Sequence, residues 1–480
     1  MSVLGRRILN NILALGGAQL VTMVTGMITA IVVARALGPS VYGVLGFGVA
    51  VLSYLGLLVN MGMDVHGVRE IARNRDLGYR LVGMIVSTRL IFAFVLFAGL
   101  VAAAPYFGWS ETVRLVLMIQ GVGLFGVALT LDFFYQAEQR MAVAALRQGG
   151  AAIAGVVAVV LFVNTPEDVF IAAAVPVAVH VLSALLLIAY FRVRVAARPA
   201  PAEPISRLGF LARSAPVALM AVLTTIYVNL DIILLGYMVP EAEVGLYVAA
   251  SRVAMIALVF PNLIHSAFLP ALSKALGDDA AANAAATNHA RSVMFFGGAV
   301  GGGGMLLAPA IVEILFGPAY AGAGFAMTIL MAHVLVSHLT AAFGTPLLAW
   351  QCDKPFTVIL AAGAFVNIVL NLIMIPLYGI EGAAIATVIT QILVWIGLMV
   401  LARKAFNLCH HGLIVRFAAA TSISMAAVWA TIEFSTISAY GPWAVMIAGG
   451  IIYLLVYSGL AIATGLTPLV ALSRLTRRGD

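Results

Sequence analysis

The sequence predicts an all-α integral membrane protein with 14 transmembrane helices, and three observations lead to this class. Hydrophobic residues make up 63% of the 480-residue chain and charged residues only 9%, against about 25% in soluble proteins. Apolar stretches long enough to cross a bilayer recur along the whole chain. The arginines and lysines between these stretches fall almost entirely in alternate loops. The net charge of +7 follows from this topology, so we expect contacts with anionic membrane lipids rather than nucleic acid.

Each predicted span is an apolar run bounded by glycine, proline or charged residues. A hydrocarbon core of roughly 30 Å requires about 20 apolar residues at about 1.5 Å rise per residue. The first run follows two arginines, as in a signal peptide, but its length and internal Asn and Gln residues indicate a retained helix. In chain order the runs cover residues 10–34, 42–62, 81–104, 113–135, 146–163, 169–190, 209–237, 244–271, 291–315, 323–349, 355–377, 381–401, 413–434 and 442–466.

The basic residues set the orientation of these helices. With a cytoplasmic amino terminus, 21 of the 26 lie in inner loops or at the inner ends of spans, and only Arg35 and Arg114 lie on the outer side. The remaining three, Arg89, Arg213 and Arg252, lie deeper within spans. The positive-inside rule therefore predicts a multi-pass protein of the cytoplasmic (inner) cell membrane with both termini in the cytoplasm, which requires an even number of spans.

A linker and a repeat divide the chain into comparable halves. We predict an N-terminal lobe over 1–198 (spans 1–6), a proline-rich cytoplasmic linker over 199–207, a C-terminal lobe over 208–405 (spans 7–12), and spans 13 and 14 with a cytoplasmic tail over 406–480. Leu37–Val51 and Leu235–Met255 both contain Leu-Gly, a polar turn, and Tyr and Gly at the head of the next helix. Six spans separate the two copies, so the repeats are parallel, and two facing six-helix lobes would enclose a central cavity.

Five segments carry a resemblance to a known family. They are Ala34–Gly43 (ARALGPSVYG), Gly62–Arg73 (GMDVHGVREIAR), Asn229–Val253, Leu315–Ala323 and Val366–Thr390. In this order they resemble the O-antigen and exopolysaccharide (Wzx-type) flippases of the multidrug/oligosaccharidyl-lipid/polysaccharide exporter superfamily, over nearly the whole chain. The resemblance implies two six-helix lobes forming a V around a central cavity, plus two C-terminal helices. Fourteen spans fit the flippase branches better than the drug-exporter branch, which usually has twelve.

The resemblance also implies a function. Proteins similar to this one move undecaprenyl-diphosphate-linked oligosaccharide repeat units from the inner to the outer leaflet by alternating access, for cell-surface polysaccharide synthesis. A glycan polymerase of the same pathway would be a partner. The alternatives are a multidrug or organic-cation antiporter of the same superfold and a lipid II flippase. A membrane-embedded glycan polymerase or ligase is disfavoured, because no outer loop exceeds about ten residues. We therefore expect a transporter and not an enzyme.

Two oppositely charged residues within spans stand out. An ionised side chain costs roughly 2.5–3.5 kcal/mol at the centre of a span, so each one requires a reason. Asp231 precedes the turn between spans 7 and 8 and Arg252 follows it, so both lie at similar depth on adjacent antiparallel helices. The pair is either a switch that a substrate phosphate or a coupling ion opens, or a fixed salt bridge.

Two further arginines are candidates for binding an anionic substrate. Arg213 and Arg89 enter spans 7 and 3 from the cytoplasmic side. Their planar guanidinium groups would match the oxygens of a diphosphate. The alternative is that both side chains reach back to the inner headgroups. Asp132, near the cytoplasmic end of span 4, is either a proton or sodium site or, as we favour, an interfacial carboxylate.

Uncharged polar residues add a second indication of a cavity. In span 1, Gln19, Thr22, Thr25 and Thr29 form a polar stripe on an apolar helix, and span 7 has a similar set that includes Asn229. The resemblance implies that spans 1, 2, 7 and 8 line the cavity. Hydrogen bonds between helices are the alternative. We favour a cavity, since sugar hydroxyls require many weak donors and acceptors.

Other chemistry has no recognisable pattern in the chain. The eight histidines have no metal-binding spacing, and no P-loop or nucleotide fingerprint occurs, so we predict no metal, cofactor or catalytic residue. Cys352 and Cys409 fall in cytoplasmic loops, where we expect free thiols. Energy would come from coupled H⁺ or Na⁺, or from the membrane potential, which gives an outward-moving anion roughly 2.3 kcal/mol per charge per 100 mV.

Overall fold

The computed structural model describes residues 3–74, 78–194 and 206–467. Within these residues every element is helical, and no β-strand occurs. Eleven helices of this described part are long and apolar enough to cross a membrane. The predicted class, an all-α multi-pass membrane protein, is therefore confirmed.

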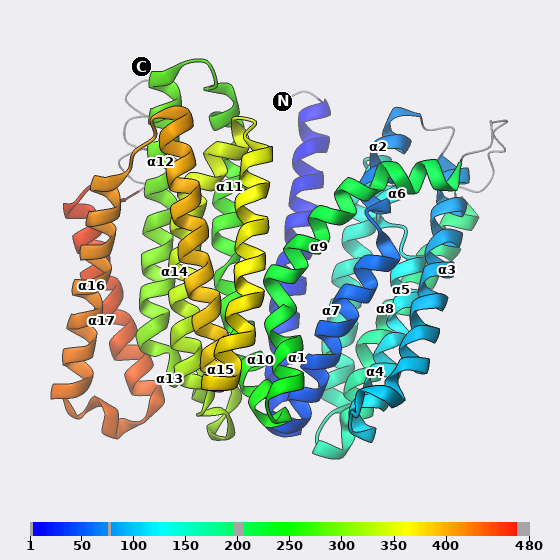
Figure 1. Ribbon diagram of the computed structural model, residues 1–480, viewed down its shortest axis with the longest axis horizontal. Helices are drawn as coiled ribbons and strands as arrows, with labels where there is room; N and C mark the ends of the chain where they lie inside the picture. The colour runs from blue at the N-terminus through cyan, green and yellow to red at the C-terminus, as the bar shows by residue number, and fades with distance from the viewer. Residues whose placement is uncertain (1–2, 75–77, 195–205, 468–480) are drawn as a thin grey trace. The chain divides into compact units, whose positions relative to one another are not determined.

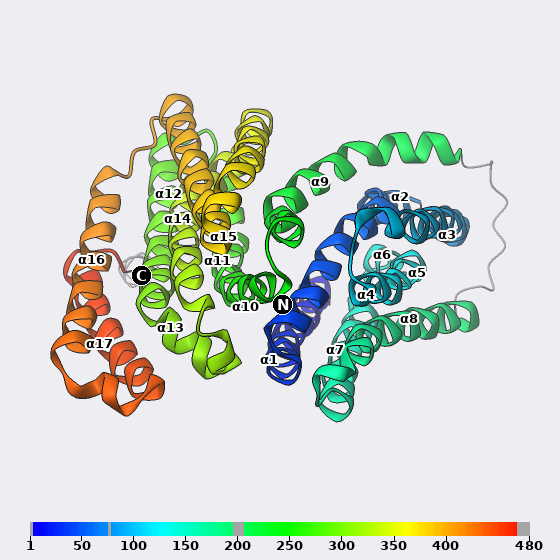
Figure 2. The ribbon, with the colours of Figure 1, turned by 60° about the horizontal axis from the view of Figure 1, so that its bottom comes forward.

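The chain forms two compact units, of which unit 1 comprises Met1–Gly236 and Pro240–Gly245. Its helices α1 and α7 run side by side, as do α5 and α8 (Figures 1 and 2). A buried cluster that includes Ile85, Phe133 and Phe210 forms its core next to α2 and α6. The elements are α1 (Val3–Asn60), α2 (Met63–Arg73), α3 (Gly78–Ala103), η2 (Ala104–Phe107), α4 (Glu111–Gly121), α5 (Gly123–Leu129), α6 (Asp132–Ala137), α7 (Met141–Phe162), η3 (Pro166–Asp168), α8 (Val169–Arg194) and α9 (Arg207–Met238).

Unit 2 comprises Tyr237–Val239 and Leu246–Asp480. A large buried cluster between α12, α14 and α15 forms its core, with Met294, Phe343 and Leu398 among its members. Its elements are α10 (Glu241–Ala257, which begins in unit 1), α11 (Val259–Lys274), α12 (Asp279–Gly297), the π-helical turn η4 (Gly298–Gly302), α13 (Gly303–Phe316), η5 (Pro318–Tyr320), α14 (Ala323–Ala349), α15 (Asp353–Phe406), α16 (His411–Phe434), η6 (Thr436–Tyr440) and α17 (Pro442–Ala463).

Two helices are much longer than one bilayer crossing, and each contains a glycine with a positive φ. α1 has 58 residues and is interrupted at Gly38 (φ 75°), while α15 has 54 and is interrupted at Gly379 (φ 57°). Both glycines lie between predicted spans, and such a backbone conformation suits glycine because it has no Cβ. The helix α9 covers predicted span 7. The total of fourteen spans stays a prediction.

Within unit 2, tyrosine hydroxyls connect α17 to α12 and η4. Tyr453 and Tyr457 of α17 are almost fully buried. Their hydroxyls donate to the carbonyl oxygens of Gly298 (2.7 Å) and Met294 (3.2 Å) at the junction of α12 and η4. Figure 1 shows α16 and α17 side by side at one edge of this unit.

The two compact units do not have the same bounds as the predicted lobes. Most of the predicted linker over 199–207 lies outside the described residues. The helix α9, which we assigned to the second lobe, packs with unit 1. The four predicted segments therefore stay predictions.

Candidate functional site

Arg89, one of the three arginines predicted within spans, forms an ion pair inside unit 1. It lies on α3, and only 1% of its surface is exposed. Its Nη2 donates to Asp64 Oδ1 at 2.7 Å and to Asn60 Oδ1 at 2.5 Å, at the junction of α1 and α2. Its guanidinium lies 5.3 Å from the centre of the Phe133 ring. These partners offset the cost of taking the charge out of water.

Asp132 forms the second buried ion pair of unit 1, at the start of α6. Arg147 of α7 donates from Nε to Oδ1 at 2.7 Å and from Nη2 to Oδ2 at 2.5 Å. Gln148 adds a hydrogen bond of 2.9 Å. The side chains of Asp132 and Arg147 are 13% and 10% exposed. The sequence did not indicate this pair, because Arg147 was counted among the loop residues. Our interpretation of Asp132 as an interfacial carboxylate stays a prediction.

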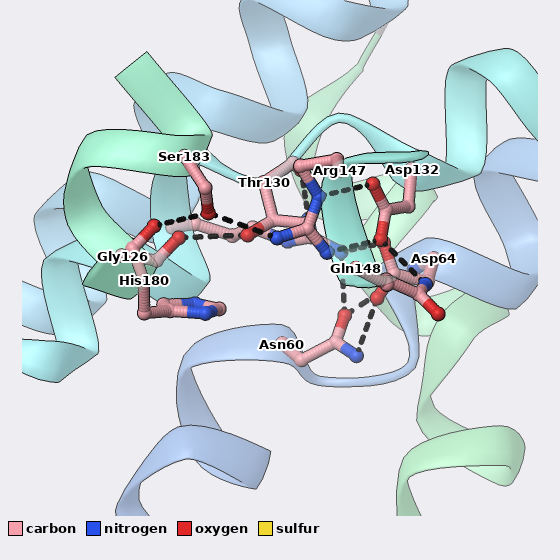
Figure 3. A network of polar contacts seen from close by, with 10 residues as sticks. Asn60, Asp64, Gly126, Thr130, Asp132, Arg147, Gln148, His180 and Ser183 are labelled. Carbon is pink, nitrogen blue, oxygen red and sulfur yellow. Dashed lines mark hydrogen bonds and ion pairs between the residues drawn. The ribbon is translucent and has the colours of Figure 1, made fainter. Parts of the chain in front are cut away.

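The two ion pairs meet at a break in predicted span 4. The helix α5 ends at Leu129 and α6 begins at Asp132, and the backbone of Thr130 between them is extended. The Thr130 carbonyl accepts a long hydrogen bond (3.5 Å) from Nη1 of Arg89, and Arg147 also donates to Ser183 Oγ of α8 at 3.2 Å. Figure 3 shows this network, which ties segments from α1 to α8 together.

The charges of this network balance. It contains two arginines and two aspartates, each arginine paired with one aspartate. The network therefore has no surplus positive charge for a substrate anion in this conformation. Binding of a diphosphate by Arg89 would require Asp64 to release it, and this role of Arg89 stays a prediction. Sequence reasoning missed Asp64 because the residue follows the end of predicted span 2.

Arg213, by contrast, is exposed on α9, and α2 packs beside it. A Cβ atom added to Gly62 would lie only 2.8 Å from the carbonyl oxygen of Ser214, so the backbones approach closely. The rings of His66 and Phe210 are 4.7 Å apart. Arg213 acts electrostatically on the His66 imidazole, as do two arginines of α2, Arg69 and Arg73.

Of the three arginines near His66, the sequence analysis predicted only Arg213 as a candidate binding residue. Arg69 and Arg73 were counted as ordinary inner-loop residues. Their spacing of four residues could have indicated a shared face of a helix. Their approach to α9 could not be predicted, since it depends on how α2 folds back after the turn at Met61 and Gly62, both of which have a positive φ.

The polar residues predicted on span 1 lie on α1 of unit 1. Gln19 and Thr22 are exposed and Thr25 is half-buried. The hydroxyl of Thr22 donates to the carbonyl oxygen of Ala18 at 2.9 Å, and that of Thr25 to Val21 at 2.7 Å. Both hydroxyl groups therefore donate their hydrogen bonds within α1, and their oxygens can still accept hydrogen bonds from another molecule. Their role in lining a cavity stays a prediction.

The predicted residues around the turn after span 7 fall in different units. Asn229 and Asp231 lie half-buried on α9 of unit 1, and Asp231 Oδ1 accepts a hydrogen bond of 2.9 Å from the backbone N–H of Ile232. Arg252 lies half-buried on α10 within unit 2. The pairing of Asp231 with Arg252 stays a prediction.

Comparison with protein families gives one match over most of the helices described above. Residues 8–276, more than half of the chain, match the family of polysaccharide biosynthesis proteins. A probable flippase, AglR of Haloferax volcanii, is 29% identical over 175 residues. That alignment covers 35% of this chain and 36% of the relative, so it spans about a third of the relative's length.

Solved structures with the same fold are membrane transporters. The lipid II flippase MurJ in an inward closed conformation has a TM-score of 0.76 at 14% identity, over 93% of this chain and 97% of that chain. An inward-facing multidrug resistance MATE family transporter of the MOP superfamily has a TM-score of 0.68 at 16% identity, over 80% and 94% of the two chains. At these identities the similarity establishes the fold.

Proposed function

The chain belongs to the family of polysaccharide biosynthesis proteins, and from this premise we propose that it is a lipid-linked oligosaccharide flippase. It would move undecaprenyl-diphosphate-linked repeat units from the inner to the outer leaflet of the cytoplasmic membrane. Alternating access of two lobes, with the polyprenyl tail in lipid, would carry the polar headgroup across.

The observation that carries this proposal is the shortness of the connections between apolar helices. Within residues 3–74, 78–194 and 206–467 the longest connections, 104–110 and 435–441, have seven residues each. A polymerase or ligase would be expected to present catalytic groups outside the membrane. A chain that is almost entirely apolar helix is suited to moving a molecule through the bilayer.

The arginines support an anionic substrate. Arg213 is exposed on α9, and guanidinium groups form two-point contacts with phosphate oxygens and remain charged at all physiological pH values. In the proposed mechanism Arg213 and Arg252 attract the diphosphate, and Asp231 restrains Arg252 while the site is empty. Arg89 contributes when Asp64 releases it. Gln19, Thr22, Thr25 and Asn229 would bind sugar hydroxyls.

The driving force follows from the charge of the substrate. An anion that leaves a negative-inside cell moves down the electrical gradient, which contributes roughly 2.3 kcal/mol per charge per 100 mV. Inward movement of H⁺ or Na⁺ in exchange would add to this drive. The membrane potential alone therefore gives the transport a direction.

A substrate comparison tests the proposal. Purified protein is reconstituted into proteoliposomes with a fluorescent undecaprenyl-diphosphate-linked oligosaccharide, with lipid II, or with an organic cation. The proposal predicts protein-dependent flipping of the oligosaccharide lipid in preference to the other two. Preferential flipping of lipid II or export of the cation would instead identify one of the two rival functions.

A further inference from the structure

The helix α2 and the start of α9 form a basic face that no part of the buried ion-pair network uses. We call Arg69, Arg73 and Arg213, which all lie near enough to His66 to act on it electrostatically, the α2–α9 face. All three arginines are exposed, and all three act electrostatically on the same imidazole. Two elements far apart in the sequence thus bring three guanidinium groups into one neighbourhood.

The carboxylates of α2 do not neutralise this face. Asp64 is bound to Arg89 at 2.7 Å on the side of the buried network. Glu70 Oε1 lies 3.8 Å from both Arg73 Nη1 and His66 Nε2. Among the described residues no ion pair occurs for Arg69 or Arg213. Within the part of the chain that the structure describes, two positive charges of the face therefore have no carboxylate partner.

The face is held in a fixed geometry. Met63, Gly67 and Ile71 recur every four residues on the opposite side of α2 and are buried. The turn at Gly62 packs directly on the backbone of α9 near Ser214. The guanidinium groups are therefore carried by elements that are already in place before a ligand arrives, which lowers the entropic cost of binding.

Exposed apolar side chains are also present on both helices. Val65 of α2 is 43% exposed and Leu208 of α9 is 81% exposed. This combination suits a ligand with an anionic headgroup and a hydrocarbon tail. Two guanidinium groups without a carboxylate partner among the described residues can each donate charge-assisted hydrogen bonds to one phosphate of a diphosphate, whereas a phosphodiester lipid has a single phosphate.

We propose that the α2–α9 face binds the diphosphate group of a polyprenyl-linked glycan at the inner surface of the membrane, before the headgroup enters the transport path. This site rests on the proposed function, since it names where the same substrate is first bound. Arg69 and Arg213 provide the two-point contacts, and Arg73 adds a third donor group beside Glu70.

A binding measurement without transport tests the site. The full chain in phosphatidylcholine nanodiscs is titrated with farnesyl diphosphate, farnesyl monophosphate and phosphatidylglycerol. We expect the diphosphate to bind most tightly, and Arg69→Gln and Arg213→Gln each to weaken it about tenfold, the loss expected for one charge-assisted contact. Arg403→Gln, an exposed arginine of α15, is the control and should leave the affinity unchanged.

Three outcomes would overturn the site. They are equal binding of phosphatidylglycerol with the same dependence on both arginines, equal weakening by Arg403→Gln, and unchanged affinity in well-folded Arg69→Gln and Arg213→Gln. Arg69→Lys, which retains the charge, should recover part of the affinity if a glutamine variant folds poorly. Intact farnesyl diphosphate binding without flipping in proteoliposomes would count against the proposed function and not against this site.

Discussion

Gly43 and Gly245, the glycines that end the two repeated turns, pack against each other in unit 1. A Cβ atom added to Gly43 would lie 2.8 Å from the backbone nitrogen of Gly245, and one added to Gly245 would lie 3.0 Å from the nitrogen of Gly43. Glu241 beside them accepts hydrogen bonds from Ser40 (3.4 Å) and Ser110 (3.2 Å). The internal repeat thus marks a place where two backbones touch.

Alanine at either glycine should therefore destabilise the protein. The added methyl group would meet backbone atoms of the other turn, which cannot move aside as a flexible side chain would. We expect Gly43→Ala and Gly245→Ala each to lower the free energy of unfolding by about 1–3 kcal/mol. Gly83→Ala on α3, where a Cβ meets nothing within 4 Å, is the control. SDS unfolding titrations measure the effect, and equal stability of all three variants would show that the contact is not tight.

Removing one partner of the Asp132–Arg147 pair should have a larger effect. Arg147→Leu leaves a buried carboxylate without its cation, which costs about 3–5 kcal/mol of stability. The double variant Asp132→Leu/Arg147→Leu should recover much of this loss, because no unpaired charge remains. Arg73→Ala, at the exposed Arg73–Glu70 pair, should change stability by about 0–1 kcal/mol. A double variant that is no more stable than Arg147→Leu would contradict the buried-pair interpretation.

His410, in the connection between α15 and α16, should make stability fall in mild acid. The pKa of His410 is lowered from 6.5 to about 4, mainly by burial and to a smaller extent by the positive charge of Arg291. Above pH 6.5 both the folded and the unfolded chain hold a neutral imidazole. Between pH 6.5 and 4 the unfolded chain binds a proton that the folded chain does not, so the free energy of unfolding decreases.

The substitution His410→Gln should reduce this acid sensitivity. The acid sensitivity is measured as the difference between the melting temperatures at pH 7.5 and pH 5. The control is His411→Gln, a substitution of the exposed neighbouring histidine. A fall in melting temperature between the two pH values that is the same in wild type and His410→Gln would assign the acid sensitivity to other groups.

The predicted pair of Asp231 and Arg252 makes a distinct prediction for transport. If Asp231 restrains Arg252 in the empty protein, Arg252→Ala should reduce flipping at least tenfold, and Asp231→Ala should reduce it as well by leaving Arg252 unrestrained. The double variant Asp231→Ala/Arg252→Ala should be no worse than Arg252→Ala alone. Full activity of both single variants in folded protein would exclude the proposed role.

The sequence was sufficient to predict the helical membrane class and the breaks between spans at Gly38 and Gly379. Both predictions use only short stretches of sequence, namely the length of each apolar run and the glycine that separates two runs. The partners of the charged residues were not predictable in the same way. Asp132 and Arg147 form their ion pair next to Thr130, where the helix of predicted span 4 is interrupted. Thr130 is neither glycine nor proline, so the sequence does not indicate the interruption. The contact between Asp132 and Arg147 depends on the packing of α6 against α7, which a single sequence does not reveal.

The most direct measurement of the central claim is the initial rate of headgroup movement across proteoliposomes that contain a fluorescent undecaprenyl-diphosphate-linked oligosaccharide. The account predicts protein-dependent flipping that Arg213→Gln reduces at least tenfold and Arg403→Gln leaves unchanged. Flipping equal to that of protein-free vesicles, or an equal rate in Arg213→Gln, would contradict it.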